Sequence, residues 1–478
     1  MTLARSPADT AAPIDPQLKK DLHRAAWACS LGSALEYYDF ALYTLASALI
    51  FGPLFFPEQT RAMSLIASFG TYFLGFAIRP LGGVLFGLIG DKVGRKVVLS
   101  STVLLMGVSS TLIGALPTFH QVGYLAPMLL VVLRLLQGLG AGAEQAGAAV
   151  MMTEYAPKGR RGFYAALPFL GIQLGTILAA IVYFVVVSGN EHITQTNLWR
   201  VPFFISVVIV ALGLYMRLRL KESPTFIRLK AQKRECANPL KSAMTHSKPT
   251  LLIGIGLRLA ENGGSSIYQA LAVSYIVGVV GLKGPVGVMT LICAASIGAL
   301  TVPIAGKLSD RFGRVVVYRA FALLQLALAF PVWWILSQGN IVASIIAISL
   351  SLGIGTWGMF GTQAALMPEL FGSRHRYMGV SIAREASAVI AGGIAPLIGA
   401  GIIAVVMATH EGDVNPGLGA WLPIACYLAL LTVSTLYTTF KTPETLNRDL
   451  DDPRDAWEVA KEDEAVHAHH QAVPVRHS

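Results

Sequence analysis

Charged residues are scarce in this chain of 478 residues: Asp, Glu, Lys and Arg together make up only 13% of it, against roughly 25% in soluble domains. Hydrophobic residues make up 54%, and the mean hydropathy is +0.59. A soluble fold cannot hide this much apolar sequence, so the composition excludes an ordinary soluble domain. Because ~20 mostly apolar residues are enough for a helix to cross a bilayer, we expect a membrane protein.

Cysteines are also few, and they lack a pattern. Cys29, Cys236, Cys293 and Cys426 show no CxxC spacing, so we interpret them as packing residues with no disulfide or metal role. The N-terminal segment 1–25 is polar and lacks the apolar core of a cleavable signal peptide. The sequence shows no metal cluster, nucleophile elbow or phosphate loop in a suitable context. We therefore expect no enzyme activity and no cofactor.

The sequence contains many long apolar stretches. We place twelve of them, at residues 26–50, 63–89, 97–116, 125–152, 163–188, 199–218, 249–280, 285–307, 315–337, 341–368, 377–406 and 417–440. Each is long enough to cross a bilayer as a helix. The sequence therefore predicts an all-α membrane protein with twelve transmembrane helices.

Two charged motifs between these stretches each occur twice. Gly87-Leu-Ile-Gly-Asp-Lys-Val-Gly-Arg-Lys96 has a counterpart in Gly306-Lys-Leu-Ser-Asp-Arg-Phe-Gly-Arg314, and 154–162 recurs loosely as 369–379. We therefore expect two pseudo-symmetric six-helix bundles, an arrangement typical of secondary transporters. The expected divisions are a tail 1–25, a bundle 26–218, a linker 219–248, a bundle 249–440 and a solvated tail 441–478.

The basic residues gather in alternate loops. Arg24, the loops after the second and fourth stretches, the linker and the matching loops of the second half are rich in Lys and Arg, whereas the opposite loops hold Arg61, Arg200 and Lys283. The positive-inside rule places the basic loops and both termini in the cytoplasm. The net charge of +10 thus indicates orientation and not nucleic-acid binding. We expect a monomeric, multi-pass protein of a bacterial inner membrane.

Glu36 and Asp39 lie inside the first apolar stretch, where ionisable residues are costly and mark pathways or partners. They are three residues apart and so share one helical face. A carboxylate in a low-dielectric environment binds a proton more readily. We interpret the pair as a proton-coupling site, with Asp39 ahead of Glu36. The alternative is an ion pair with an arginine of the second or fourth stretch.

Arg134 begins a polar stripe in the fourth stretch. Gln137 and Gln145 follow it on the same helical face, with small residues between them. A guanidinium group binds a carboxylate through two parallel hydrogen bonds. We therefore expect Arg134, Gln137 and Gln145 to bind a carboxylate substrate.

Further intramembrane residues are candidates for the same site. Arg79 precedes Pro80 and two glycines, and it is either a second anchor for the substrate or a partner of Asp39. Arg258 and Glu261 could pair with each other, and the flexible run after Glu261 begins with Asn262. Arg384 and Glu385 could also pair with each other. The candidate substrate-binding residues are Arg134, Arg79, Gln137, Gln145, Tyr43, Tyr38, Arg258, Glu261, Asn262 and Arg384.

The repeated loop residues have a different expected role. A carboxylate in such a loop can cap a helix N-terminus or meet a basic side chain across the interface between the bundles. Contacts of this kind can form in one conformation and break in another. The candidate gating residues are Asp91, Arg95, Lys96, Asp310, Arg314, Glu154 and Glu369.

The motif from Gly87 to Lys96 resembles the signature loop between spans 2 and 3 of the major facilitator superfamily, and Asp310 to Arg314 resembles its second-half copy. Segments 36–40, 76–83, 134–138 with Gly142, and 222–226 resemble the metabolite:proton symporter family, nearest its shikimate-permease-like branch. Members of that family carry α-ketoglutarate, citrate, shikimate, proline or betaine. The resemblance implies two six-helix bundles, a central cavity and rocker-switch alternating access.

Three functions are open at this stage. The first is proton-coupled import of a small organic acid, with the proton gradient as the energy source. The second is proton symport of a zwitterion such as proline or betaine, since Tyr37, Tyr38 and Tyr43 could hold a quaternary ammonium by cation–π attraction. The third is a receptor-like membrane protein without transport. The expected partners are the substrate, protons and lipid.

Overall fold

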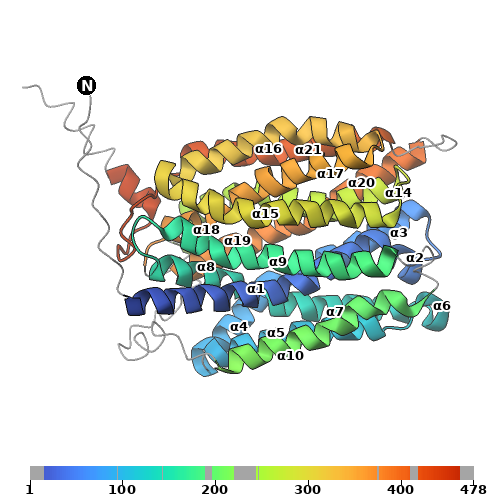
Figure 1. Cartoon of the computed structure of the whole chain (residues 1–478), viewed down its shortest axis with the longest axis horizontal. Coiled ribbons are helices and arrows are strands. Elements are labelled where there is room, and N and C mark those ends of the chain that lie inside the picture. Colours follow the sequence, from blue (N-terminus) through green and yellow to red (C-terminus); the bar gives the residue numbers. More distant parts are fainter. Residues whose placement is uncertain are drawn as a thin grey trace, which may run out of the picture.

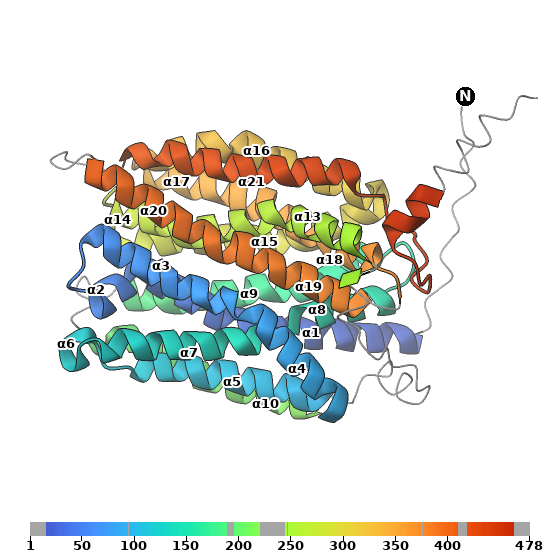
Figure 2. The ribbon, with the colours of Figure 1, turned by 180° about the vertical axis from the view of Figure 1, so that it is seen from behind.

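The structure, a computed structural model, describes residues 16–93, 95–142, 144–188, 196–219, 244–245, 247–373, 376–409 and 418–462. Within these ranges the regular structure is helical, without strands. Figure 1 shows an elongated bundle in which the first half of the chain, blue to green, lies alongside the second half, yellow to red. The view from behind shows the same two layers (Figure 2).

The helices of the first half follow the expected stretches. They are α1 (Pro16–Leu49), α2 (Phe51–Phe55), α3 (Arg61–Ala77), α4 (Arg79–Val93), α5 (Arg95–Ala115), α6 (Phe119–Val122), α7 (Leu125–Ala141), α8 (Glu144–Tyr155), α9 (Arg161–Ser188), η1 (Asn197–Arg200) and α10 (Val201–Arg219). Two stretches are therefore divided, one between α3 and α4 and one between α7 and α8. The first break falls beside Pro80, which has no N–H group to give to a continuous helix.

The second half repeats this plan. Its elements are α13 (Lys248–Ser266), η2 (Ile267–Leu271), α14 (Ala272–Gly278), α15 (Gly284–Phe312), α16 (Arg314–Ser337), α17 (Ile341–Ile348), η3 (Ser349–Thr356), α18 (Trp357–Leu370), α19 (Arg376–Ser387), η4 (Ala388–Gly393), α20 (Ile394–Thr409), η5 (Leu418–Ala420) and α21 (Trp421–Lys441). The segments η2, η3 and η4 are π-helical and continue the α-helices that flank them. Such π-segments are frequent near functional sites.

Every expected stretch coincides with a helix or a run of consecutive helices in the described ranges. Nine of these segments are long and apolar enough to cross a membrane. Those outside the nine are α1, α5 and the run from α13 to α14. Both α1 and α13 carry intramembrane carboxylates, Glu36 and Asp39 in one and Glu261 in the other, which lowers their mean hydropathy.

Two expected boundaries are wrong. Helix α1 begins at Pro16 and not near residue 26. Its first turns are stabilised by packing, since Leu22 and Ala26 are buried in a cluster with Met152 and Tyr164. Residues 442–462 are also not a solvated tail. They lie against the end of the second half, with Leu450 and Ala456 buried and a short helix over 456–462.

Glycines allow the helices to approach closely where the two halves meet. A Cβ atom on Gly162 in α9 would lie 2.3 Å from the carbonyl oxygen of Gly306 in α15, and one on Gly306 would lie 2.4 Å from that of Gly162. Only glycine fits at such a distance between two backbones. This contact brings the N-terminus of α9 next to the α15–α16 turn.

Candidate functional site

Eight charged residues predicted to lie inside the membrane form, together with Gln137 and Gln145, a buried polar cluster that both halves contribute to. Each is at most 5% exposed: Glu36, Asp39, Arg79, Arg134, Gln137, Gln145, Arg258, Glu261, Arg384 and Glu385. Burying a charge without a partner is costly. The partners of each group therefore show how the cluster can work.

Asp39 in α1 is held by a hydroxyl group. Ser206 of α10 donates from Oγ to Asp39 Oδ1 at 2.6 Å. Within the described residues Asp39 forms no ion pair with an arginine. A carboxylate that is held by a hydroxyl group and not by a guanidinium can take up a proton without leaving a buried arginine unpaired.

Arg134 in α7 is fully buried, with 0% exposure, and its guanidinium is only partly satisfied. Its Nη1 donates to Gln137 Oε1, but Nε and Nη2 have no hydrogen-bond partner, and no described carboxylate pairs with it. The guanidinium carbon lies 3.8 Å from the ring centre of Tyr43, 5.2 Å from that of Phe40 and 5.4 Å from that of Tyr72. Stacking on aromatic rings holds the side chain without neutralising its charge.

Arg79 joins the two halves. Its Nε lies 2.9 Å from Glu385 Oε2 in α19, and its Nη2 donates to Oε1 at 3.4 Å. The alternative that Arg79 pairs with Asp39 is therefore wrong, and so is a pair between Arg384 and Glu385. Adjacent side chains of a helix do not face each other, so these two residues reach different partners.

A second contact between the halves passes through an amide. Arg384 Nη2 donates to Gln145 Oε1 at 2.5 Å, and Gln145 Nε2 donates to Glu36 Oε1 at 3.2 Å. Gln145 thus lies between a carboxylate of α1 and a guanidinium of α19. In this conformation both ends of its amide are engaged by the protein.

The remaining candidate residues of the second half form their hydrogen bonds and ion pairs mainly with residues of that same half. Arg258 Nη1 lies 3.3 Å from Glu261 Oε2, and it also donates to Gln363 Oε1 at 3.0 Å. Its Nε donates to Ser387 Oγ at 2.9 Å. With its amide turned so that the oxygen faces Arg258, Asn262 accepts from Nη2 at 3.3 Å. Arg258 therefore has its charge neutralised, unlike Arg134.

The two candidate tyrosines of α1 are in different positions. Tyr43 lies beside Arg134, and its hydroxyl donates to Thr71 Oγ1 at 2.7 Å. The hydroxyl of Tyr38 donates to the carbonyl oxygen of Pro202 in α10 at 3.0 Å. Tyr38 thus packs α1 against α10, whereas Tyr43 belongs to the surroundings of Arg134.

Four of the seven candidate gating residues, Glu154, Asp310, Arg314 and Glu369, lie at one end of the molecule, which we call the basic-loop end. It comprises the N-terminus of α9, the α15–α16 turn and residues 442–462, and it lies at the left of Figure 1. The two carboxylate oxygens of Asp310 accept from the backbone N–H groups of Gly162, at 2.8 Å, and Phe163, at 2.9 Å. A carboxylate of the second half therefore caps a helix N-terminus of the first.

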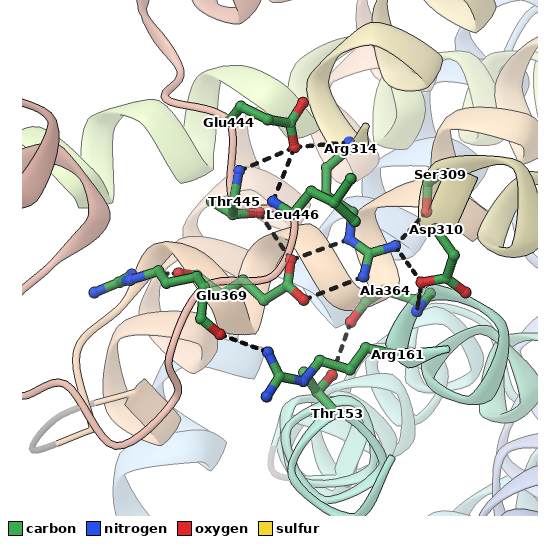
Figure 3. A network of polar contacts seen from close by, with 12 residues as sticks. Thr153, Arg161, Ser309, Asp310, Arg314, Ala364, Glu369, Glu444, Thr445 and Leu446 are labelled. Carbon is green, nitrogen blue, oxygen red and sulfur yellow. Dashed lines mark hydrogen bonds and ion pairs between the residues drawn. The ribbon is translucent and has the colours of Figure 1, made fainter. Parts of the chain in front are cut away.

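Arg314 is the centre of a buried network at this end (Figure 3). It contacts Glu369 with Nε and Nη2, at 3.1 and 3.2 Å, and Asp310 with Nη1 at 2.7 Å. Thr445 donates to Glu369 Oε2 at 2.8 Å, and Glu444 accepts from the backbone N–H of Arg314 at 2.8 Å. Arg314 is thus held by its bidentate ion pair with Glu369 and by Glu444 of the C-terminal segment, and it in turn holds Asp310 in position.

Further contacts cross between the halves here. Arg376 Nη1 donates to Glu154 Oε1 at 3.0 Å, and Arg161 Nη1 donates to the carbonyl oxygen of Arg448 at 2.6 Å. In the C-terminal segment, hydrogen bonds from Arg454 lower the pKa of Asp452 to about 2. The side chains of Asp91, Arg95 and Lys96 lie outside the described residues.

The Asp310 cap gives a first prediction. In Asp310→Asn the amide nitrogen cannot accept from one of the two backbone N–H groups, which costs about 1–3 kcal/mol. The contact between the halves should weaken, so we expect uptake to slow about tenfold while substrate Kd changes less than about threefold. Asp452→Asn, at the same end but paired with Arg454 of its own segment, is the control. A large loss of equilibrium binding in Asp310→Asn would instead place Asp310 in the substrate site.

Sequence reasoning missed several polar residues of the cluster. They are Tyr72 beside Arg134, Ser110 beside Gln137, Ser206 beside Asp39, and Gln363 and Ser387 beside Arg258. Each is an uncharged side chain within an apolar stretch. Gln363 was the most recognisable of them, since an amide inside a membrane span needs partners. Among the described residues no group of His, Cys, Asp and Glu could hold a metal ion.

Comparisons with known proteins agree with this architecture. The sequence model of the Major Facilitator Superfamily matches residues 29–396. The chain is 34% identical over 430 residues to the inner membrane metabolite transport protein YhjE of Escherichia coli (strain K12), covering 88% of this chain and 94% of that one. It is 34% identical to the shikimate transporter of the same organism, covering 85% and 91%. It is 33% identical to the proline/betaine transporter of Salmonella typhimurium (strain LT2), covering 90% and 85%.

Solved structures share the fold at low sequence identity. The proton:xylose symporter XylE bound to 6-bromo-6-deoxy-D-glucose superposes with a TM-score of 0.69 at 17% identity, over 91% of this chain and 98% of that one. A partially occluded inward-open form of XylE from E. coli gives 0.67 at 16% identity, over 89% and 98%. These structures show the fold alone, whereas the family model and the relatives of 33–34% identity show the family. The chain belongs to the Major Facilitator Superfamily and, within it, to the metabolite:proton symporter family, and it is a secondary transporter and not an enzyme.

Proposed function

We propose that this transporter imports a small carboxylate together with protons, by alternating access. The observation that carries the proposal is the state of Arg134. It is fully buried, it has two nitrogen atoms without a partner, and no described carboxylate pairs with it. An anionic substrate would relieve the cost of this buried charge.

The backbone beside Arg134 leaves room for its guanidinium. A Cβ atom on Gly75 in α3 would lie 2.2 Å from Arg134 Nε and 2.7 Å from Cζ. Glycine is therefore required at this position if the side chain is to keep its place against Tyr43. The position of the guanidinium is thus set by α3 as well as by α7.

A second prediction follows from Gly75. In Gly75→Ala the added methyl group must displace the guanidinium, so we expect carboxylate binding to weaken at least about tenfold, or about 1.4 kcal/mol. Gly70→Ala is the matched control on α3, since a Cβ there meets nothing within 4 Å. Equilibrium binding of both purified variants is the measurement. Unchanged affinity in Gly75→Ala would show that the substrate does not use Arg134 in its present position.

An anion fits this site better than a zwitterion with a quaternary ammonium group. The case for betaine rested on aromatic rings that could hold a cation. The rings of Phe40, Tyr43 and Tyr72 are already beside the guanidinium of Arg134. A second cation there would be repelled by the first, whereas a carboxylate would be attracted.

Alternating access is supported by polar contacts between the halves at three levels. They are the Asp310 cap at the basic-loop end, the Arg79–Glu385 pair in the middle, and a hydrogen bond from Ser274 Oγ in α14 to the carbonyl oxygen of Ala48 in α1, 3.0 Å long, near the opposite end. Separating the halves on one side requires breaking some of these contacts. We propose that the substrate and the proton shift the balance between them.

The remaining features of the proposal concern setting and energy source. The proton gradient drives accumulation without a bound cofactor, and Asp39 and Glu36 are the groups that bind the proton. The protein works as a monomer in a bacterial inner membrane, with the basic-loop end and both termini in the cytoplasm. The alternative, a receptor-like protein, would bind the same substrate but would not carry it across the membrane.

A thermal-shift screen of the purified protein tests the substrate class. A ligand that binds the folded state at 100 times its Kd adds about 2.7 kcal/mol of stability. We expect monocarboxylates or dicarboxylates to raise Tm and betaine to do so less. Stabilisation by betaine with none by carboxylates that lack an ammonium group would overturn the proposal. Uptake of the stabilising compound into proteoliposomes then separates a transporter from a receptor.

A further inference from the structure

The buried cluster contains four arginines, and only two of them are paired with carboxylates. Arg79 and Arg258 each form an ion pair within the cluster. Arg134 and Arg384 form none with any residue that the structure describes. Arg134 belongs to the first half and Arg384 to the second, and both are at most 2% exposed. Each half thus contributes one buried guanidinium without a counter-charge.

The guanidinium of Arg384 is only partly satisfied. Its Nη2 donates to Gln145 Oε1 at 2.5 Å, but its Nε has no hydrogen-bond partner. The guanidinium carbon lies 5.0 Å from the ring centre of Phe169 in α9, and this ring is stacked on that of Phe360 in α18 at 4.3 Å. The rings hold the side chain without neutralising its charge. Because a carboxylate oxygen is a stronger acceptor than an amide oxygen, an acidic group can replace Gln145 at Arg384.

Another polar group without a partner lies on the same face of α9. Gln173 follows Phe169 by four residues, which is about one helical turn. It is 0% exposed, and neither its Nε2 nor its Oε1 has a hydrogen-bond partner. Burying an amide without partners is costly, and a ligand that supplies them would remove the cost. The NH₂ group of Gln173 can donate to the same acidic group that Arg384 binds.

The two unpaired guanidiniums are connected through one ring and one ion pair. Arg134 and Arg79 both lie over the ring of Phe40, with their guanidinium carbons 5.2 and 5.3 Å from its centre. Arg79 in turn pairs with Glu385, the residue next to Arg384 in α19. Arg134 and Arg384 therefore belong to one continuous group of side chains. A short molecule with an acidic group at each end matches this arrangement.

We infer that Arg384 and Gln173 form a second subsite for an acidic group, so that the substrate is a dicarboxylate. Arg134 of the first half binds one carboxylate, and Arg384 of the second half binds the other. This inference rests on the proposed function, and it narrows the substrate from small carboxylates in general to those with two acidic groups. A substrate held in this way contacts both halves at once.

Charge balance distinguishes a dicarboxylate from a monocarboxylate here. A single carboxylate neutralises one guanidinium and leaves the other buried without a counter-charge, which is costly. Taking a second carboxylate out of water is also costly unless a cation meets it. A preference for dicarboxylates over monocarboxylates of the same length therefore requires a second cation in the site. Arg79 and Arg258 are already paired within the protein, so Arg384 is that cation.

Matched pairs of ligands test this inference on the purified full-length protein. The probes are succinate, glutarate and adipate, each compared with the monocarboxylate of the same length, which is butyrate, valerate or hexanoate. At a pH of about 7.5 all these carboxylates are ionised. A hydrogen bond to a charged group strengthens binding by at least about tenfold. We therefore expect the best dicarboxylate to bind the wild type at least about tenfold more tightly than its monocarboxylate.

Arg384→Gln removes the second cation and keeps a polar side chain. The ratio of the two Kd values should fall to about threefold or less, while the Kd of the monocarboxylate changes less than about threefold. Arg319→Gln in α16 is the control, since it removes a guanidinium that is bound to Thr439 outside the cluster. It should keep the wild-type ratio.

Gln173→Leu serves if Arg384→Gln does not fold, because it removes an amide from the same subsite without changing any charge. It should lower the ratio at least about threefold. Equal Kd values for the dicarboxylate and the monocarboxylate at all three lengths would overturn the inference while leaving carboxylate transport intact. An unchanged ratio in Arg384→Gln and Gln173→Leu would do the same. Absence of carboxylate binding to the wild type would overturn the proposed function, and the inference with it.

Discussion

Replacing Arg134 with lysine should weaken carboxylate binding by about 1–3 kcal/mol, the range for hydrogen bonds to charged groups. Lysine keeps the positive charge but loses the planar guanidinium, which can offer Nε and Nη2 together to a carboxylate. These two nitrogens are the ones without a partner in the structure. The loss should therefore appear in equilibrium Kd and not only in transport rate.

Arg134→Ala should lose binding almost completely while the protein still inserts and folds. Removing one member of a buried ion pair normally leaves a stranded charge, but Arg134 has no carboxylate partner among the described residues. Arg319→Ala in α16, which removes a guanidinium bound to Thr439 away from the cluster, is the control for general effects. Normal carboxylate binding by Arg134→Ala would make Arg134 structural and leave Arg79 or Arg258 as the better anchor.

The sequence was informative wherever a feature depends on neighbouring positions along one helix. Twelve apolar stretches correspond to helical segments because length and hydropathy act locally. The contact between Arg134 and Gln137 was likewise predictable, since residues three apart lie on adjacent turns of one helix. The close pair of Arg258 and Glu261, three residues apart, is a contact of the same local kind. Gln145 lies beyond the break between α7 and α8, and it contacts Glu36 and Arg384 instead.

Contacts between the halves could not be derived in the same way. Arg79 and Glu385 are 306 positions apart, and only the packing of α4 against α19 shows that they meet. Nothing local distinguishes that pairing from a contact between Arg79 and Asp39. The same reasoning applies to residues 442–462. Their polar composition suggests a solvated tail, yet Glu444 caps α16, and Asp455 accepts from the backbone N–H of Gly372.

Hydroxyl groups formed the least predictable part of the site. Serines are common in apolar stretches, where they bond to the carbonyl oxygen four residues earlier, as Ser109 does with Leu105. Ser206 differs only in donating to a carboxylate of another helix, and Ser110 in accepting from an amide of another helix. That distinction requires the relative rotation of the helices, which one sequence does not provide.

Replacing Asp39 with asparagine should abolish accumulation of substrate against its gradient. Asparagine has nearly the same shape, and its oxygen can still accept from Ser206 Oγ, which lies 2.6 Å from Asp39 Oδ1 in the wild type. It cannot bind or release a proton, so the energy of the proton gradient can no longer be coupled to the substrate. Exchange of internal for external substrate needs no net proton movement and should continue.

Proteoliposomes with an imposed pH gradient separate these two activities, because net accumulation and counterflow are measured on the same preparation. Glu36→Gln is the matched variant, since Glu36 lies on the same face of α1 but contacts Gln145 and not Ser206. If Asp39→Asn concentrates substrate as well as the wild type while Glu36→Gln does not, Glu36 carries the proton. Accumulation by the double variant Asp39→Asn/Glu36→Gln would exclude this pair of α1 carboxylates as the coupling site.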